Sequence, residues 1–320
     1  MLSCVAEGGE KDGAWLACLI GGALSSCATT GEVLVSPILE RVTHGTCENG
    51  SVRLHYASLG EGPLVVMLHG FPDWWYTWRH QMEALAADHR VVALDMRGYN
   101  LSDSPAGVES YAIDVLTGDV LALLDELGSE RAVIVGHDWG GAVAWSFAIQ
   151  HPERTAGLVV CNMPHPGCLQ REFSRAGSGQ FEAGQYARDF QAEGAHEALS
   201  AEKLASWVTD PEARALTIEA FERSDFEAML HYYKANYPRP DSPPVFPDDP
   251  RSLPAAARVA ASVLMIFGLE DTALLPSTLN DTWRWLAGDL TLVTIPGAGH
   301  FVQQDAADLV SRSIAAWLAR

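Results

Sequence analysis

The 320-residue chain is poor in basic residues and in cysteine. It has 21 lysine and arginine residues against 41 aspartate and glutamate residues, which gives a net charge of −20. Such a field repels a phosphate backbone, so we expect no nucleic-acid partner. Six cysteines are too few for a disulfide scaffold at this length, and none forms the CxxC pair that would predict a zinc site.

The sequence also lacks the common cofactor motifs. It contains no HExxH, no GxxxxGK[ST] and no strand-linked GxGxxG. We therefore expect neither a metal nor a cofactor. Any chemistry must come from side chains alone.

Residues 1–33 have an ambiguous pattern. The apolar run Trp15–Leu24 is too short to span a bilayer, but it precedes Cys27 and a small polar stretch, as in a bacterial lipoprotein signal. The residues before the run carry three acidic side chains and one lysine, whereas a secretion signal needs positive charge there. We interpret 1–33 as an N-terminal extension or a lipoprotein-like signal. The protein is accordingly expected in the cytoplasm or exported and anchored at Cys27.

From residue 34 onward the pattern becomes regular. His44–Tyr56 predicts a β-hairpin that turns at Asn49-Gly50. Short runs that are apolar on both faces follow, and helical stretches at Tyr111–Leu127 and Gly140–Gln150 lie between them. These runs are Leu64–Leu68, Val91–Leu94, Ala132–Val135, Leu158–Val160, Val263–Phe267 and Leu290–Ile295. The alternation predicts an α/β fold with a mostly parallel sheet, its strands buried on both sides and flanked by helices.

The strand pattern stops between about residues 164 and 253. Helical periodicity occurs around Ala195–Val208 and Thr217–Ala235, and a proline-rich segment, Tyr237–Pro250, follows. An all-helical insertion between two sheet strands predicts a cap over a site. We therefore expect a core of residues 34–163 and 254–320 and a helical cap of residues 164–253.

A candidate nucleophile lies at the end of the run Ala132–Val135. There the sequence Gly136-His137-Asp138-Trp139-Gly140-Gly141 leads into a helix, which is the small-x-nucleophile-x-small-small pattern of a nucleophile elbow. The small residues allow a sharp strand-to-helix turn, and the helix N-terminus favours negative charge on Asp138. The alternative is that Asp138 merely caps the helix.

An aspartate at the centre of the elbow indicates attack on a saturated carbon. Serine would form an ether there, which the enzyme could not release, whereas a carboxylate forms an ester that water can open. Asp138 therefore predicts displacement on an epoxide or an alkyl halide.

Two further residues complete a catalytic set. Asp271 follows the run Val263–Phe267, and His300 follows Leu290–Ile295. His300 would activate the water that attacks the ester, and Asp271 would fix its tautomer and stabilise its cation. The neighbouring Glu270 is an alternative orienting acid.

From about Leu34 to its end, the chain resembles the epoxide hydrolase branch of the α/β-hydrolase family. The matching segments are His69–Arg79, Asp95–Asp103, Gly136–Gly141 and the turns at Asp271 and His300. The order nucleophile, acid, histidine is also that of this family. The resemblance implies that backbone N–H groups of Phe71 and Trp139 hold the oxyanion, with His69 and Pro72 in supporting positions. For the nearby Trp74, Trp75 and Trp78 we expect core packing.

The resemblance also implies two cap tyrosines that hold the epoxide oxygen and donate a proton as the ring opens. Tyr186 and Tyr233 match these positions, and Tyr232 is the alternative to Tyr233. A phenol suits this role because it remains a donor throughout the neutral pH range.

The function that follows is hydrolysis of an epoxide to a vicinal diol through an aspartyl ester. The expected partners are a small-molecule epoxide and water, with the protein a monomer or homodimer. One alternative is a haloalkane dehalogenase, which would not need the tyrosines and tends to carry asparagine where Phe71 stands. Another is a non-catalytic small-molecule-binding protein, although the complete Asp-Asp-His set argues against it.

Overall fold

The computed structural model describes residues 37–239, 244–252 and 258–320. The predicted N-terminal extension with Cys27, and the predicted boundary between cap and core at residues 253–254, lie wholly or partly outside the described residues.

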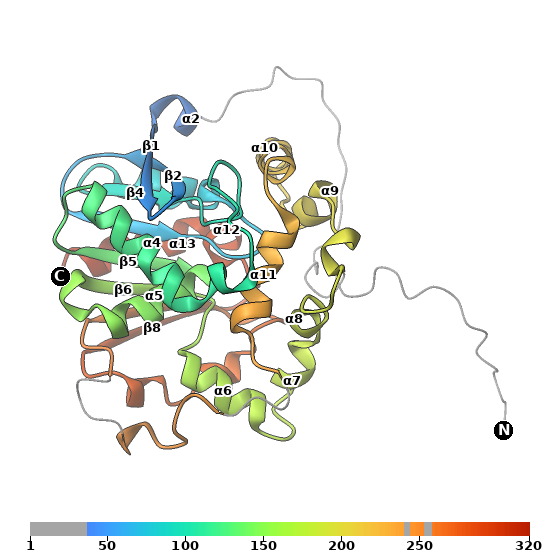
Figure 1. Cartoon of the computed structure of the whole chain (residues 1–320). Helices are drawn as coiled ribbons and strands as arrows, with labels where there is room; N and C mark the ends of the chain where they lie inside the picture. Colours follow the sequence, from blue (N-terminus) through green and yellow to red (C-terminus); the bar gives the residue numbers. More distant parts are fainter. Residues whose placement is uncertain (1–36, 240–243, 253–257) are drawn as a thin grey trace.

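The core of the molecule is one eight-stranded sheet with the strand order β1-β2-β4-β3-β5-β6-β7-β8 (Figure 1). The strands are β1 (Thr43–Asn49), β2 (Val52–Leu59), β3 (Leu64–Leu68), β4 (Arg90–Leu94), β5 (Ala132–His137), β6 (Thr155–Cys161), β7 (Val263–Gly268) and β8 (Leu290–Ile295). β1 and β2 form the predicted hairpin, and β2 pairs antiparallel with β4. All other neighbours are parallel, which confirms the predicted mostly parallel α/β sheet.

Helices cover both faces of the sheet. The core helices are α2 (Pro37–Arg41), α3 (Arg79–Leu85), α4 (Ile113–Glu126), α5 (Trp139–Gln150), α12 (Val302–Asp305) and α13 (Ala307–Leu318), with the 3₁₀ helices η1 (Trp75–Trp78), η2 (Val108–Tyr111), η3 (Pro152–Arg154), η8 (Pro276–Leu279) and η9 (Thr282–Trp285). α4 packs on α5, and α3 packs on α13. Successive residues of β3 enter different cores: Val66 and Leu68 belong to the cluster that includes α4 and α5, Val65 and Met67 to the cluster that includes α3 and α13. This double burial is the reason for the continuous apolar runs.

The prediction of burial on both sides is wrong for β8. In this strand only Ile295 is buried, and Leu292 and Thr294 are exposed. β8 is the last strand of the sheet among the described residues, so it has a neighbour, β7, on one edge only. A continuous apolar run does not distinguish an edge strand from a central one.

A helical insert lies between β6 and β7. It contains α6 (Pro166–Ser174), α7 (Gln180–Ala183), α8 (Gln185–Asp189), η4 (Ala195–Ala198), α9 (Ala201–Leu204), η5 (Ala205–Trp207), α10 (Pro211–Glu222), α11 (Phe226–Asn236) and η6 (Pro250–Ser252). Figure 1 shows α8 to α11, in yellow and orange, beside one end of the sheet.

Two predicted helices of the insert are wrong in extent. The stretch Thr217–Ala235 is divided between α10 and α11, because the Asp225 side chain accepts the N–H of Ala228 and starts a new helix. The stretch Ala195–Val208 consists of three short pieces, and Ser200 caps the middle one. In both cases the capping residue interrupts a periodicity that otherwise continues.

Among the described residues, no helix is both long and apolar enough to cross a membrane.

Candidate active site

Asp138 occupies a sharp turn between β5 and α5. Its backbone has φ 49° and ψ −122°, a conformation that side-chain-bearing residues rarely adopt. A Cβ at Gly136 would collide with the backbone of Gly140, and one at Gly140 would collide with the carbonyl groups of Leu68 and His69. The two glycines thus allow the turn to close, and the turn places Asp138 at the carboxyl end of the central strand.

The carboxylate of Asp138 contacts two groups from other parts of the chain. Oδ1 accepts the backbone N–H of Phe71 at 2.8 Å, and Oδ2 lies 3.5 Å from Nε2 of His300. The side chain makes no capping hydrogen bond to α5, so the interpretation as a helix cap is wrong. Burial opposes the charged form, but the hydrogen bond and charge of His300 and the Phe71 N–H outweigh it and lower the pKa of Asp138.

His300 lies between two carboxylates. Its Nδ1 is 2.8 Å from Oδ2 of Asp271, and its Nε2 faces Asp138. Burial lowers the pKa of His300, but the Asp271 and Asp138 carboxylates outweigh this effect and raise the pKa to about 10. The contact comes from Asp271, whereas the neighbouring Glu270 side chain is exposed.

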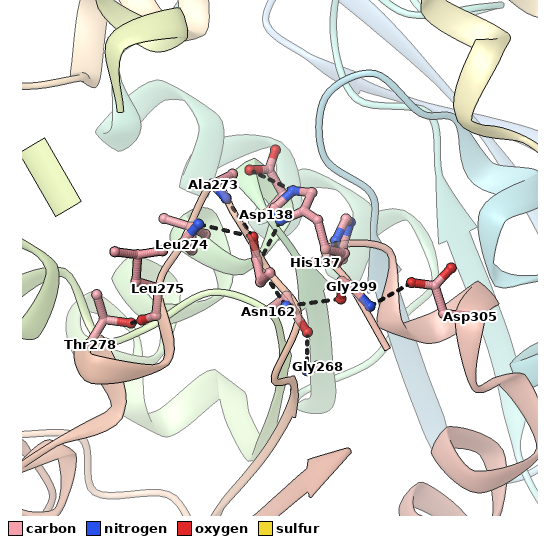
Figure 2. A network of polar contacts seen from close by, with 12 residues as sticks. His137, Asp138, Asn162, Gly268, Ala273, Leu274, Leu275, Thr278, Gly299 and Asp305 are labelled. Atoms are coloured by element: carbon pink, nitrogen blue, oxygen red, sulfur yellow. Dashed lines mark hydrogen bonds and ion pairs between the residues drawn. The ribbon is translucent and has the colours of Figure 1, made fainter. Parts of the chain in front are cut away.

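Asp271 is held by three donors besides His300. Oδ2 accepts from Nδ2 of Asn162 at 2.6 Å, and Oδ1 accepts the backbone N–H groups of Ala273 and Leu274 at 2.8 and 3.0 Å (Figure 2). Both oxygens are therefore engaged in a buried site, and the carboxylate has a fixed orientation toward the imidazole.

Asn162 is a site residue that sequence reasoning missed. It has φ 40° and follows β6 directly. Besides Asp271, its Nδ2 contacts the carbonyl of Gly299 at 3.3 Å, and its Oδ1 accepts the N–H of Gly268 at 2.8 Å (Figure 2). Asn162 thus ties together the ends of three neighbouring strands. A polar residue immediately after a buried parallel strand was the available signal.

His137 is a second missed residue. Its Nε2 lies 2.8 Å from the carbonyl oxygen of His300, and the two rings are 4.9 Å apart. A carbonyl only accepts, so Nε2 carries the proton and Nδ1 does not. Nδ1 is buried without a partner among the described residues, and burial lowers the pKa of His137 to about 4. His137 is therefore a neutral anchor beneath His300.

The two predicted cap tyrosines belong to the aromatic cluster around Phe71 and Trp139, the residues beside Asp138. The Tyr233 ring is 5.4 Å from Phe71 and 5.1 Å from Trp139, and the Tyr186 ring is 6.2 Å from Tyr233. Burial, with a contribution from the Asp138 charge, raises the pKa of both phenols well above its ordinary value. Both hydroxyls consequently stay protonated at neutral pH.

Tyr232 is engaged elsewhere. Its hydroxyl donates to the backbone carbonyl of Arg97 at 2.9 Å, and its ring packs on Tyr99 and Tyr111. Its O–H is thus already used inside the core.

His69 fixes the loop that carries Phe71. Its Nε2 accepts the N–H of Met96 at 3.0 Å, so Nδ1 is protonated and donates to the carbonyl of Gly70 at 2.9 Å. Pro72 is buried in the same loop, and its peptide bond to Phe71 is cis. Trp139 is the first residue of α5 and is buried beside Tyr233. Of the two predicted oxyanion N–H groups, the one that contacts Asp138 is that of Phe71.

The tryptophans near this loop are buried, as expected for core packing. Trp74, Trp75 and Trp78 are at most 5% exposed. The indole of Trp74 also donates to the hydroxyl of Thr217 in α10 at 3.1 Å and so joins core and insert. In the described part of the chain, no cluster of three or more histidine, cysteine or acidic side chains is arranged to hold a metal ion.

Comparisons with known proteins agree with the fold and with the predicted hydrolysis of epoxides. A family model described as the alpha/beta hydrolase fold matches residues 63–307. Epoxide hydrolase 1 of Caenorhabditis elegans is 36% identical over 278 residues, which cover 83% of this chain and 68% of the relative. Epoxide hydrolase 3 of Xenopus tropicalis is 30% identical over 279 residues, covering 83% and 75%.

A solved structure agrees as well. The crystal structure of Bacillus megaterium epoxide hydrolase in complex with an inhibitor superposes with a TM-score of 0.77 at 29% identity. The superposition covers 86% of this chain and 100% of that one.

Proposed function

Since this chain belongs to the epoxide hydrolases of the α/β-hydrolase fold family, we propose that it adds water to an epoxide through an ester of Asp138. The observation that carries the proposal is the position of the Asp138 carboxylate. It is held by the N–H of Phe71 on one oxygen and faces the imidazole of His300 with the other.

In the first step Asp138 attacks a ring carbon of the epoxide. Oδ1 is held by Phe71, which leaves Oδ2 to form the new C–O bond. The ring C–O bond breaks, and the epoxide oxygen takes a proton from one of the two phenols, Tyr186 and Tyr233. The product is a hydroxyalkyl ester of Asp138.

In the second step water attacks the carbonyl carbon of this ester. Nε2 of His300 takes the water's proton, and Asp271 stabilises the resulting imidazolium. The negative charge that develops on Oδ1 is held by the N–H of Phe71, with the N–H of Trp139 as the proposed second donor. The tetrahedral intermediate then collapses. The His300 imidazolium protonates the departing alkoxide oxygen, so the vicinal diol leaves, and the carboxylic acid of Asp138 returns its proton to His300, which restores the starting ion pair.

The ester also changes the protonation of the base. In the free enzyme the Asp138 charge helps to raise the pKa of His300 to about 10, so the imidazole is a cation at neutral pH. Alkylation neutralises Asp138 and removes that contribution. The pKa of His300 therefore falls when the ester forms, so His300 can release its proton to restore the phenol that protonated the epoxide oxygen. The imidazole is then the free base that the second step needs.

We propose a neutral small-molecule epoxide as substrate. Next to Asp138, the rings of Phe71 and Trp139 pack in one aromatic cluster with those of Tyr186, Phe190 and Tyr233, and none of these five side chains is charged. The Bacillus megaterium relative has been crystallised with an inhibitor and with a diol product, which is consistent with this class. Phenols that donate to an epoxide oxygen have no task in the release of a halide ion, so they disfavour the dehalogenase alternative.

The test is turnover of styrene oxide and of 1-bromobutane, side by side, by the wild type, Asp138→Asn and His300→Gln. We expect diol from the epoxide only, loss of turnover in Asp138→Asn, and in His300→Gln a persistent mass increase equal to the substrate. Bromide release without diol would make the chain a dehalogenase. Normal turnover by His300→Gln would show that the base is misassigned.

A further inference from the structure

The helical insert contacts the loop of the catalytic histidine through one aromatic pair. The indole of Trp207, at the end of η5, lies flat on the ring of Phe301, with ring centroids 3.6 Å apart and planes inclined by 2°. Phe301 directly follows His300 and is 5% exposed. The contact therefore joins the insert to the residue next to the proposed base.

Phe301 in turn touches both histidines of the site. Its ring meets His300 edge-on at 5.2 Å and lies 5.5 Å from His137. A ring that contacts the imidazole fixes its position by packing, since buried side chains transmit displacements to their neighbours. The orientation of Phe301 is therefore coupled to that of His300.

The remaining restraints on this loop come from the core. His137 holds the carbonyl of His300, and the Asp305 carboxylate accepts the N–H of Gly299 at 2.8 Å (Figure 2). Asn162 holds the carbonyl of Gly299. These hydrogen bonds fix the backbone, whereas the side of the loop that faces the insert is held by the stack with Trp207.

The indole of Trp207 is held in place by packing of its flat face, not by a hydrogen bond to any of the described residues. Its Nε1 is buried and has no hydrogen-bond partner among the described residues, although buried indole N–H groups usually find one. The flat contact with Phe301 is accordingly what orients the ring.

We propose that Trp207 is a positioning residue for the general base, through which the helical insert supports hydrolysis of the ester. This inference rests on the proposed function, in which His300 acts as a base only in the second step. The first step uses Asp138 and the two phenols, and none of these side chains is in a ring contact with Trp207. Loss of the stack should therefore slow ester hydrolysis and spare ester formation.

The experiment is rapid-quench single turnover of styrene oxide, with the ester fraction followed by mass spectrometry. In Trp207→Leu we expect ester hydrolysis to slow about tenfold, with ester formation within about twofold of the wild type. Trp207→Phe keeps a flat face and should restore most of the hydrolysis rate. Trp207→Met also removes the flat ring and should behave like Trp207→Leu. It replaces Trp207→Leu in the experiment if that variant does not fold.

Thr217→Val is the matched control. It removes a different side-chain contact between insert and core, the hydrogen bond from Trp74, without touching the His300 loop. We expect no ester to accumulate in this variant. Accumulation equal to that in Trp207→Leu would show that general loosening of the insert is responsible and would overturn the proposal.

Two further outcomes separate this inference from the proposed function. If Trp207→Leu and Trp207→Met hydrolyse the ester at the wild-type rate, or slow both steps equally, Trp207 does not position the base. If His300→Gln forms no ester in the same assay, the Asp138 mechanism itself fails, whatever the Trp207 variants do.

Discussion

Nε2 of His300 lies 3.5 Å from Oδ2 of Asp138, so the proposed base and the proposed nucleophile form an ion pair in the free enzyme. Burial lowers the pKa of His300, but this pair and the Asp271 carboxylate together raise it to about 10. In the proposed mechanism the cation stabilises the Asp138 carboxylate and can act as a base only after Asp138 has been alkylated. The same contact has a consequence for folding.

We predict that His300 makes the stability of the protein fall as the pH rises. The folded protein keeps the His300 proton up to about pH 10, whereas an unfolded histidine releases it near its model value of 6.5. The contribution is therefore complete below pH 6.5 and is lost between 6.5 and 10. In this window the free energy of unfolding should decrease by up to ~1.4 kcal/mol per pH unit. Chemical denaturation at pH 6, 7.5 and 9 measures it.

The control for this prediction is His300→Gln, which cannot bind the proton. The free energy of unfolding of this variant should not show the part of the decrease above pH 7 that comes from His300. Asp73, whose pKa burial raises to about 7, changes the stability mainly below that window and is present in both proteins. Equal slopes for both proteins between pH 7.5 and 9 would mean that folding does not raise the pKa of His300.

Adjacent tyrosines of α11 should respond differently to loss of the hydroxyl. Tyr233→Phe removes a donor beside Asp138, so ester formation should slow by about 10²-fold, as expected for loss of a general acid. Tyr232→Phe leaves the carbonyl of Arg97 buried without its donor and should cost ~1–3 kcal/mol of stability, with ester formation little changed. Single-turnover rates and denaturation curves test both. Slower ester formation in Tyr232→Phe, with Tyr233→Phe unchanged, would make Tyr232 the proton donor and Tyr233 the structural residue.

The nucleophile elbow at Asp138 illustrates how much of the site can be predicted from the sequence alone. The spacing of glycines around Asp138, and the placement of Asp271 and His300 after two apolar runs, predict three side chains that the structure brings together. This works because parallel strands end at one edge of the sheet. The choice between Tyr232 and Tyr233 has no such basis, because adjacent residues of a helix share one periodicity and differ only in what packs against them.

Asn162 and His137 were missed for a related reason. Both act by binding backbone groups of loops distant in sequence, and no spacing rule links them to those loops. The broken helices of the insert depend on single capping residues, Ser200 and Asp225, whose effect competes with the surrounding periodicity. Burial of β8 depends on where the sheet ends, which is a property of the topology.

His137 should be replaceable by glutamine but not by leucine. The glutamine amide donates from nearly the same position as Nε2 and can keep the carbonyl of His300 in place. His137→Leu leaves that carbonyl unpaired, so ester hydrolysis should slow about tenfold or more while ester formation persists. Since the pKa of His137 is lowered to about 4, His137→Gln should keep the wild-type pH profile between pH 5 and 9. A shifted profile would indicate that His137 is charged in the active enzyme.

Variants of Asp271 and of Glu270 give the most direct test of which acid orients His300. Asp271→Asn removes the charge that stabilises the His300 cation, so the ester should form and then hydrolyse far more slowly, by a factor on the order of 10³–10⁴. Glu270→Gln changes an exposed side chain and should leave both rates within about twofold of the wild type. Because ester formation depends on Asp138, its retention in Asp271→Asn would show that the fold is intact. Arrest of hydrolysis in Glu270→Gln, with Asp271→Asn active, would assign the acid to Glu270 and leave the Asp271 network with a structural role only.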